Sequence, residues 1–173
     1  MRSPLSRCDT AGISFLKGTE VTTPVWSDAI ALEIDTVQYE TGEGPCLDAI
    51  TNEATVYAED LTEDPRWPSF GPRAVTLGMR SHLSCPLSAS GTLGALNLYA
   101  RLPRASGAID RTRALIFGVH AGMALGVAAA LEDATISLSS EIHRVENLPA
   151  ALTSREVIGQ AQGILIERGH ITA

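Results

Sequence analysis

The chain has 173 residues and a mass of 18.3 kDa, enough for one full domain with a small appendage. Its net charge of −7 has the wrong sign for a protein that coats nucleic acid. Hydrophobic residues make up 45%, which excludes wholesale disorder. The longest apolar stretch, near residues 121–131, is short for a membrane span, and the N-terminus lacks a secretory signal, so we expect a cytoplasmic protein without membrane contact.

Charges and cysteines are distributed unevenly. Twelve carboxylates and no basic residue lie between Lys17 and Arg66, whereas residues 66–113 hold seven arginines and one acid. Arginine outnumbers lysine twelve to one, which is typical of a GC-rich genome. The three cysteines are widely spaced and form no CxxC, which argues against a zinc finger and against a disulfide framework.

The first half of the chain predicts strands and short helices in alternation. A Lys17-Gly18 turn separates the first two strands, Ser27-Asp28 provides a helix cap, and Pro45 suits the first turn of a second helix. The expected elements are strands at Ala11–Leu16, Val21–Trp26 and Ala54–Ala58, and helices at Ala29–Val37 and Pro45–Thr51.

The second half predicts a helix over Phe70–Leu77, a hairpin of Arg80–Leu87 with Thr92–Ala100, and a helix from Ile109 to about Glu146. A helix of that length, ~57 Å, cannot be covered by one small domain, so a homodimeric coiled coil is expected. Pro149 should kink or end it. Thr153 and Glu156 then form a capping box that opens a helix through about Arg168.

Five short motifs occur in an order that resembles the GAF domains of the bacterial GAF–ANTAR regulators. They are CDTAGISF (Cys8–Phe15), QYETGEGPCLDA (Gln38–Ala49), DLTEDPRWP (Asp60–Pro68), GMRSHLSCPL (Gly78–Leu87) and GALNLY (Gly94–Tyr99). The tail ALTSREVIGQAQGILIERG (Ala151–Gly169) is similar to the opening helix of an ANTAR domain.

The resemblance implies an α+β fold, with an antiparallel sheet of five or six strands flanked by helices, followed by a long helix and a partial ANTAR helix. The implied domains are a GAF core over 1–107, a dimerisation helix over 108–148 and an ANTAR segment over 149–173. The implied function is a non-enzymatic sensor that presents ANTAR helices to RNA and suppresses transcription termination.

Two other functions remain open, because the chain matches one of the three ANTAR helices. The GAF core could sense a small molecule or a redox change and act through protein contacts alone. Alternatively, the chain could be an incomplete paralogue without an output. Residues 150–173 carry two arginines and two glutamates, a weak electrostatic attraction for RNA.

Four residues are candidates for lining a GAF pocket: Cys46, Trp67, His82 and Cys85. The helix start at Cys46 would lower the pKa of its thiol, whereas the surrounding carboxylates would raise it. His82 and Cys85 lie three residues apart on a strand and should face opposite sides, which disfavours a shared metal. The simpler interpretation is that Cys46 is a small buried residue and that Trp67 closes the core over the sheet, with Arg66 paired to Asp60 or Asp64.

The candidate RNA contacts in the tail are Arg155, Gln160, Ala161, Gly163 and Arg168, with a helix end that packs in a dimer as the alternative. His120 is a weak haem candidate. The Thr41–Pro45 loop matches no nucleotide-binding motif, so its glycines are interpreted as a tight turn. No catalytic constellation, cofactor or metal is expected; an unknown small-molecule ligand and RNA remain possible partners.

Overall fold

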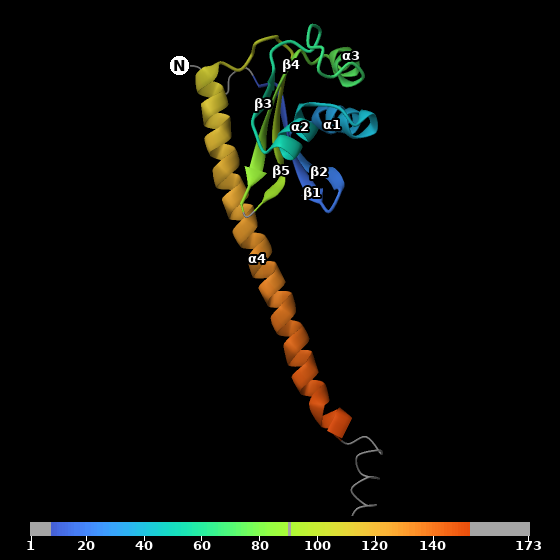
Figure 1. Ribbon diagram of the computed structural model, residues 1–173, viewed down its shortest axis with the longest axis vertical. Coiled ribbons are helices and arrows are strands. Elements are labelled where there is room, and N and C mark those ends of the chain that lie inside the picture. Colours follow the sequence, from blue (N-terminus) through green and yellow to red (C-terminus); the bar gives the residue numbers. More distant parts are fainter. Residues whose placement is uncertain (1–7, 90, 153–173) are drawn as a thin grey trace, which may run out of the picture. The chain divides into compact units, whose positions relative to one another are not determined.

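The computed structural model describes residues 8–89 and 91–152, with side chains as far as residue 139. It divides into two units, Met1–Val127 and Ala128–Ala173, and the sheet and the candidate pocket residues belong to the first. Figure 1 shows this first unit as a sheet with helices against both of its faces.

The sheet has five antiparallel strands in the order β2-β1-β5-β4-β3. Their bounds are β1 Thr10–Lys17, β2 Glu20–Trp26, β3 Val56–Ala58, β4 Ser81–Ser88 and β5 Thr92–Ala100. Both predicted hairpins form, because a glycine-containing turn separates two β-rich runs in each. The pairing of β1 with β5 joins the two hairpins into one sheet.

Three short helices cover the inner face of this sheet (Figure 1): α1 Ala29–Thr41, α2 Pro45–Asn52 and α3 Phe70–Thr76. Asp28 caps α1 as predicted, since its Oδ1 accepts a hydrogen bond from Ile30 N at 3.0 Å. α1 runs four residues beyond the predicted end and stops at Gly42, whose left-handed φ of 66° suits a helix C-cap.

The first part of α4 (Ala108–Leu152) covers the outer face of the sheet. Apolar side chains from β4 and β5 pack there against small and aliphatic residues of the helix, and burying this apolar surface stabilises the contact. The outer cluster consists of Leu83, Cys85, Leu87, Leu96 and Ala114, with Ile13, Tyr57, Leu98, Ala121 and Leu125 partly buried beside it.

Pro149 does not end α4, which continues to Leu152. Of the two predicted effects of this proline, an end of the helix is therefore wrong, and a kink stays a prediction. A proline removes one backbone hydrogen bond to the residue four earlier, and at this position that loss falls within the last two turns of the helix. The predicted capping box at Thr153 lies outside the described residues.

Within the described residues, one helical segment, Ala108–Ser139, is long and apolar enough to cross a membrane, with a mean hydropathy of 2.0 in its most apolar window. This differs from the sequence prediction, which relied on an unbroken apolar run. Only 17% of that window is buried inside the protein. Length and composition alone are weak evidence for a span, because the core helix of a soluble protein or a signal sequence meets the same criteria.

Candidate functional site

Polar side chains gather on the inner face of the sheet, beneath α1 and α2. Asn97 and Tyr99 are alternate residues of β5, and alternate residues of a strand share a face. Asp35 reaches this face from α1, and all three side chains are fully buried. We call the hydrogen-bonded set the Asp35 network: Ser14, Thr23, Asp35, Gln38, Tyr39, Cys46, Ser84, Asn97 and Tyr99.

The Asp35 carboxyl group accepts four hydrogen bonds. Its Oδ1 accepts from Tyr99 Oη, from Asn97 Nδ2 at 3.0 Å and from Gln38 Nε2 at 3.1 Å. Its Oδ2 accepts from Thr23 Oγ1 at 2.9 Å. A Cβ at Gly12 on β1 would lie 2.8 Å from that Oδ2, so the carboxyl group packs directly on bare backbone.

Burial raises the pKa of Asp35 to about 6, against the lowering effect of its hydrogen bonds. Desolvation penalises the charged carboxylate, whereas hydrogen bonds to the carboxylate stabilise it. Here desolvation is the larger effect. The carboxyl group therefore exchanges its proton closer to neutral pH than an ordinary aspartate does.

Ser14 links this carboxyl group to the rest of the network. Its Oγ accepts a hydrogen bond from Asn97 Nδ2 at 2.9 Å and lies 2.8 Å from Tyr39 Oη. Cys46 Sγ donates a hydrogen bond to Ser14 Oγ at 3.3 Å. The network thus joins four strands of the sheet, β1, β2, β4 and β5, to α1 and α2.

Cys46 is a buried member of the network. Burial and the nearby Asp35 raise the pKa of its thiol to about 12, so the thiol stays protonated. The sequence predicted two opposing effects on this pKa, a lowering by the helix start and a raising by nearby carboxylates. The pKa is raised. Burial is the largest cause, and the negative charge of Asp35 is the second. A neutral, buried thiol is a poor nucleophile and a poor redox sensor.

The glycine-rich loop before Cys46 is built around Gln38. The backbone N–H of Cys46 donates to Gln38 Oε1 at 2.8 Å. A Cβ at Gly44, where φ is 139°, would lie only 2.2 Å from the same oxygen. The loop also directs the Glu43 carboxylate at the start of α3, where it accepts from Ser69 N at 2.7 Å. These contacts fit the predicted tight turn.

His82 lies on the inner face of β4 and is fully buried. Neither ring nitrogen makes a hydrogen bond among the described residues, and burial lowers the pKa of the ring to about 3, with the Asn97 side chain opposing part of this shift. The ring stacks on Tyr99, with 4.2 Å between the centroids. His82 is therefore a neutral, aromatic core residue that carries unused polar atoms.

Trp67 closes the core between the sheet and the loop that precedes α3. It is 3% exposed, and its Nε1 donates to Asp48 Oδ2 at 2.9 Å. The Arg66 guanidinium lies over the indole ring, 4.1 Å from the centroid, and its Nη2 pairs with Asp64 Oδ2 at 2.6 Å. The prediction of a core tryptophan is confirmed, and of the two predicted partners Arg66 selects Asp64.

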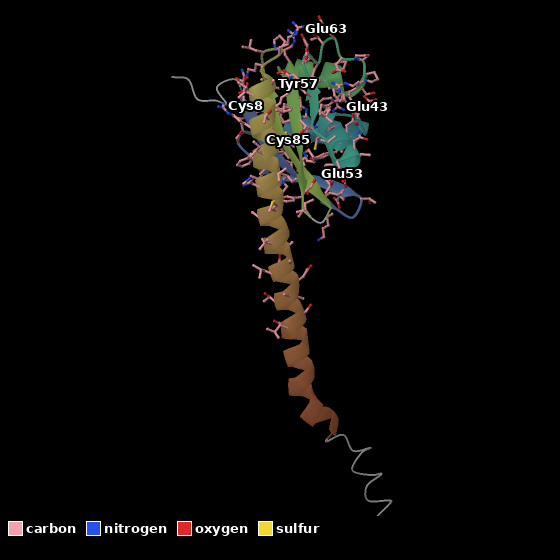
Figure 2. All side chains as sticks on the ribbon, turned by 60° about the vertical axis from the view of Figure 1, so that its left-hand side comes forward. Cys8, Glu43, Glu53, Tyr57, Glu63 and Cys85 are labelled. Carbon is pink, nitrogen blue, oxygen red and sulfur yellow. The ribbon has the colours of Figure 1, made fainter. Side chains whose placement is uncertain are left out.

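Cys85 lies on the opposite face of the sheet from His82, as the spacing predicted. It is buried in the outer cluster beneath α4, and Figure 2 shows it on the strand beside that helix. Burial raises the pKa of its thiol. The four predicted pocket residues are thus not brought to one place. Trp67 and His82 pack in the same inner region, around Phe70 and Tyr99. Cys46 packs in another inner cluster, and Cys85 lies on the outer side.

Two cavities of the first unit are lined by other residues. A polar pocket of about 260 Å³ lies among loop residues that include Tyr57, Asp64, Arg66 and Arg104. An apolar cavity of about 570 Å³ lies on the outer face beside α4. We call it the outer groove; its lining is Ala11, Gly12, Ile13, Val25, Trp26, Ser27, Leu96, Leu98, Arg113, Ala114 and Phe117.

Among the described residues, no group of three or more His, Cys, Asp and Glu side chains could hold a metal ion. His120 is an exposed residue of α4. The candidate RNA contacts Arg155, Gln160, Ala161, Gly163 and Arg168 lie outside the described residues.

The sequence analysis missed Asp35, Asn97 and Tyr99 as a functional group. One signal was present: Asn97 and Tyr99 are alternate residues of an otherwise apolar strand, and an amide in a buried strand needs a hydrogen-bond partner. The partner could not be identified from local pattern, since Asp35 lies 62 residues away along the chain.

Comparison with known proteins gives the same fold. The chain superimposes on a domain of a putative two-component sensor histidine kinase from Sinorhizobium meliloti 1021 with a TM-score of 0.61 and 12% identity, covering 74% of this chain and 85% of that one. For the GAF region of a putative membrane protein from Geobacter sulfurreducens PCA, the TM-score is 0.57 and the identity 15%, with coverages of 70% and 83%.

An enzyme shares this fold as well. The type II free methionine-R-sulfoxide reductase of Thermoplasma acidophilum superimposes with a TM-score of 0.53 and 15% identity, covering 67% of this chain and 77% of that one. No curated protein matches the chain in sequence. The family description "GAF domain" matches residues 3–126, which is more than half of the chain and includes the whole sheet, both of its covered faces and the Asp35 network. This chain therefore belongs to the GAF domain family, a family of sensor modules found in signalling proteins.

Proposed function

We propose that this chain is the sensor part of a cytoplasmic, homodimeric regulator whose C-terminal segment binds RNA and suppresses transcription termination. The observation that carries this proposal is the extent of α4, which begins beside the sheet and is helical as far as Leu152. The next residue, Thr153, opens the segment that resembles an ANTAR helix. A helix that leads from a sensor to such a segment suits the transmission of a signal.

The exposed side of α4 supports the dimer. Ala114, Gly118 and Gly122 form its buried side, facing the sheet. On the opposite side an apolar stripe recurs at spacings of seven and four residues: Ile109, Ile116, Met123 and Val127, which are 67%, 54%, 59% and 62% exposed. A stripe at this spacing packs favourably against its counterpart on a second copy.

The output segment would use its polar side chains to contact RNA. Arg155 and Arg168 would meet phosphates, Gln160 a base edge, and Ala161 and Gly163 would allow close helix packing. The family resemblance supports this assignment. The absence of a catalytic motif and the protonated, buried state of Cys46 support a non-enzymatic role.

A second function is favoured by the balanced charge of residues 150–173, which hold two arginines and two glutamates. In this case the chain would sense its signal and act through protein contacts made by the dimer. RNA affinity separates the two functions, because phosphate contacts make binding fall steeply with salt.

The test is a titration of the 173-residue chain with a tandem stem-loop RNA at low and at moderate salt. We expect saturable binding that weakens with salt and that is reduced by Arg155→Gln and Arg168→Gln. Arg101→Gln, an exposed residue of the first unit, is the matched control for loss of one positive charge. Binding that is absent, or equally weak in all three variants, would favour the function through protein contacts.

The dimer is tested separately by sedimentation of the wild type and of Ile116→Asp. We expect a mass of twice 18.3 kDa for the wild type and a monomer for the variant, since the charge lies in the centre of the stripe. A wild-type monomer at tens of micromolar would contradict the dimer.

A further inference from the structure

One face of α1 attaches this helix to the sheet through polar side chains. Asp35, Gln38 and Tyr39 are three and four residues apart, so they leave the helix on the same side. Tyr39 Oη lies 2.8 Å from the hydroxyl of Ser14 on β1, and Gln38 Nε2 donates to Tyr99 Oη on β5 at 3.2 Å. Asp35 lies between these contacts and is the centre of the attachment.

No positive charge neutralises the Asp35 carboxylate. Among the described residues the four ion pairs lie elsewhere, and no basic side chain is a cause of the pKa shift of Asp35. Lys17 and Glu20, the charged residues of β1 and β2, are exposed at the turn between these strands. The titratable groups that face Asp35 from α1, α2, β4 and β5 are neutral near pH 7: Tyr39, Cys46, His82 and Tyr99. When ionised, Asp35 is therefore a buried charge that hydrogen bonds alone stabilise, which is costly.

The carboxyl group packs too closely on β1 for water to enter between them. A Cβ at Gly12 would lie 2.8 Å from Asp35 Oδ2 and 3.4 Å from the methyl group of Thr23. A water molecule needs a space of about 1.4 Å radius, which this contact does not leave. Water can therefore reach Oδ2 from this side only if α1 moves away from the sheet.

A chain of hydroxyl groups leads from this carboxyl group towards the surface. Asp35 Oδ2 lies 2.9 Å from Thr23 Oγ1, which in turn lies 2.6 Å from Tyr39 Oη. Either hydroxyl of the second pair can donate, so the chain can reverse its direction when Asp35 gains a proton. Asp35 and Thr23 are buried, whereas Tyr39 is half-buried. The chain thus gives the proton a hydrogen-bonded path between the carboxyl group and the edge of the core.

We propose that Asp35 is a proton-operated latch, whose protonated form holds α1 on the sheet and whose ionised form favours a sparsely populated open state with α1 moved outward. In the closed, protonated form Oδ2–H donates to Thr23, and Thr23 donates to Tyr39. On release the proton passes along this chain to water. Burial raises the pKa of Asp35 to about 6, which places the change close to neutral pH.

The latch deepens the proposed function by naming a change in pH as the signal, and it rests on that function for its biological role. Its physical basis lies within the first unit and requires neither RNA nor the dimer. A failure of RNA binding or of dimer formation in the assays above would contradict the proposed function and leave the latch intact. The exchange experiment below tests the latch alone.

Movement of α1 would reach the other two inner helices through two contacts. Gln38 Nε2 donates to Asp35 Oδ1 at 3.1 Å, and Gln38 Oε1 accepts from Cys46 N in the first turn of α2. Glu43, which follows the C-cap of α1, accepts from Ser69 N at the start of α3. The open state therefore loosens the start of α2 together with α1, whereas the outer cluster beneath α4 lies on the other face.

The experiment is hydrogen–deuterium exchange of the 173-residue chain between about pH 4 and about pH 7.5, with each rate divided by its intrinsic rate at that pH. In the open state water surrounds the carboxyl group, and its pKa returns to about 3.9. The difference of about two pKa units predicts that protection of α1 and of the start of α2 falls about a hundredfold up to about pH 6.5 and then levels off. Peptides from β4 and β5 should keep higher protection at every pH.

Two variants and one spectroscopic measurement identify Asp35 as the cause. Asp35→Asn should remove the pH dependence of α1 protection. Glu33→Gln is the matched control, because it removes an exposed carboxylate from the same helix, and it should keep the wild-type dependence. The infrared band of a protonated carboxyl group should disappear from the wild type between about pH 5 and about pH 7 and should be absent from Asp35→Asn at both. The wild-type spectrum and exchange data test the latch even if that variant does not fold.

Three results would overturn the proposal. The first is a protection of α1 that is constant across this pH range in the wild type. The second is the same pH dependence in Asp35→Asn, which would assign it to another group. The third is equal protection of α1 and β5 peptides at every pH, which would show that Asp35 affects global unfolding alone and that α1 does not open separately.

Discussion

The buried carboxyl group of Asp35 predicts an unusual dependence of stability on pH. Its pKa is about 6 in the folded protein, against about 3.9 in an unfolded chain. The folded state therefore binds this proton more tightly than the unfolded state. The resulting stabilisation is complete below about pH 4 and is lost as the pH rises through 6. The difference of about two pKa units corresponds to roughly 3 kcal/mol, since one unit is about 1.4 kcal/mol.

Asp35→Asn isolates this contribution. An amide can place its oxygen where Oδ1 accepts from Tyr99, Asn97 and Gln38. Its nitrogen would face Thr23 Oγ1, which can accept instead of donating. We therefore expect a folded variant whose stability relative to the wild type increases by roughly 3 kcal/mol between about pH 4 and about pH 6.5, and then levels off.

The assay is urea unfolding, followed by tryptophan fluorescence across this pH range at fixed protein concentration. Only the difference between the two proteins is interpreted, because carboxylates with lowered pKa, such as those of Asp64 and Glu43, affect both in the opposite direction. Asp35→Ala should be destabilised throughout, since it leaves buried donors unpaired. Glu33→Gln, an exposed change on the same helix, controls for the lost charge. A difference that is flat or of opposite slope would show that the four hydrogen bonds outweigh desolvation.

Three further predictions concern the inner face. Cys46 should resist thiol reagents in the native protein and react on unfolding, and the chain should not reduce free methionine sulfoxide, because the thiol is buried and protonated; rapid labelling of Cys46 without unfolding would contradict this. Gly12→Ala should destabilise the protein by about 1–3 kcal/mol in urea unfolding, because its Cβ meets Asp35 Oδ2 at 2.8 Å, whereas an unchanged midpoint would mean that the carboxyl group can move away. Trp67→Phe should lower the free energy of unfolding by about 1–3 kcal/mol in the same assay, since it leaves Asp48 without its indole donor and removes ring volume from the core. If the loss of stability is the same when Asp48→Asn is already present, packing alone explains it and the hydrogen bond contributes nothing.

The sequence by itself determined the local structure of this protein and its family. Turns, caps and hairpins depend on neighbouring residues, so Lys17-Gly18, Asp28 and Pro45 could be interpreted correctly without knowledge of the fold. The opposite facing of His82 and Cys85 followed from strand geometry alone. The family match over residues 3–126 includes all five of the quoted GAF motifs.

Only the tertiary structure decided the chemistry of the interior. The charge effects on Cys46 opposed one another along the sequence, and burial, which depends on what packs around the thiol, settled the direction of its pKa shift. The raised pKa of Asp35 likewise requires residues from β2, β5 and α1 to meet in a buried space. The outer groove depends on how much of the sheet α4 leaves uncovered. These properties arise from contacts between distant residues and from exclusion of water, which no local pattern encodes.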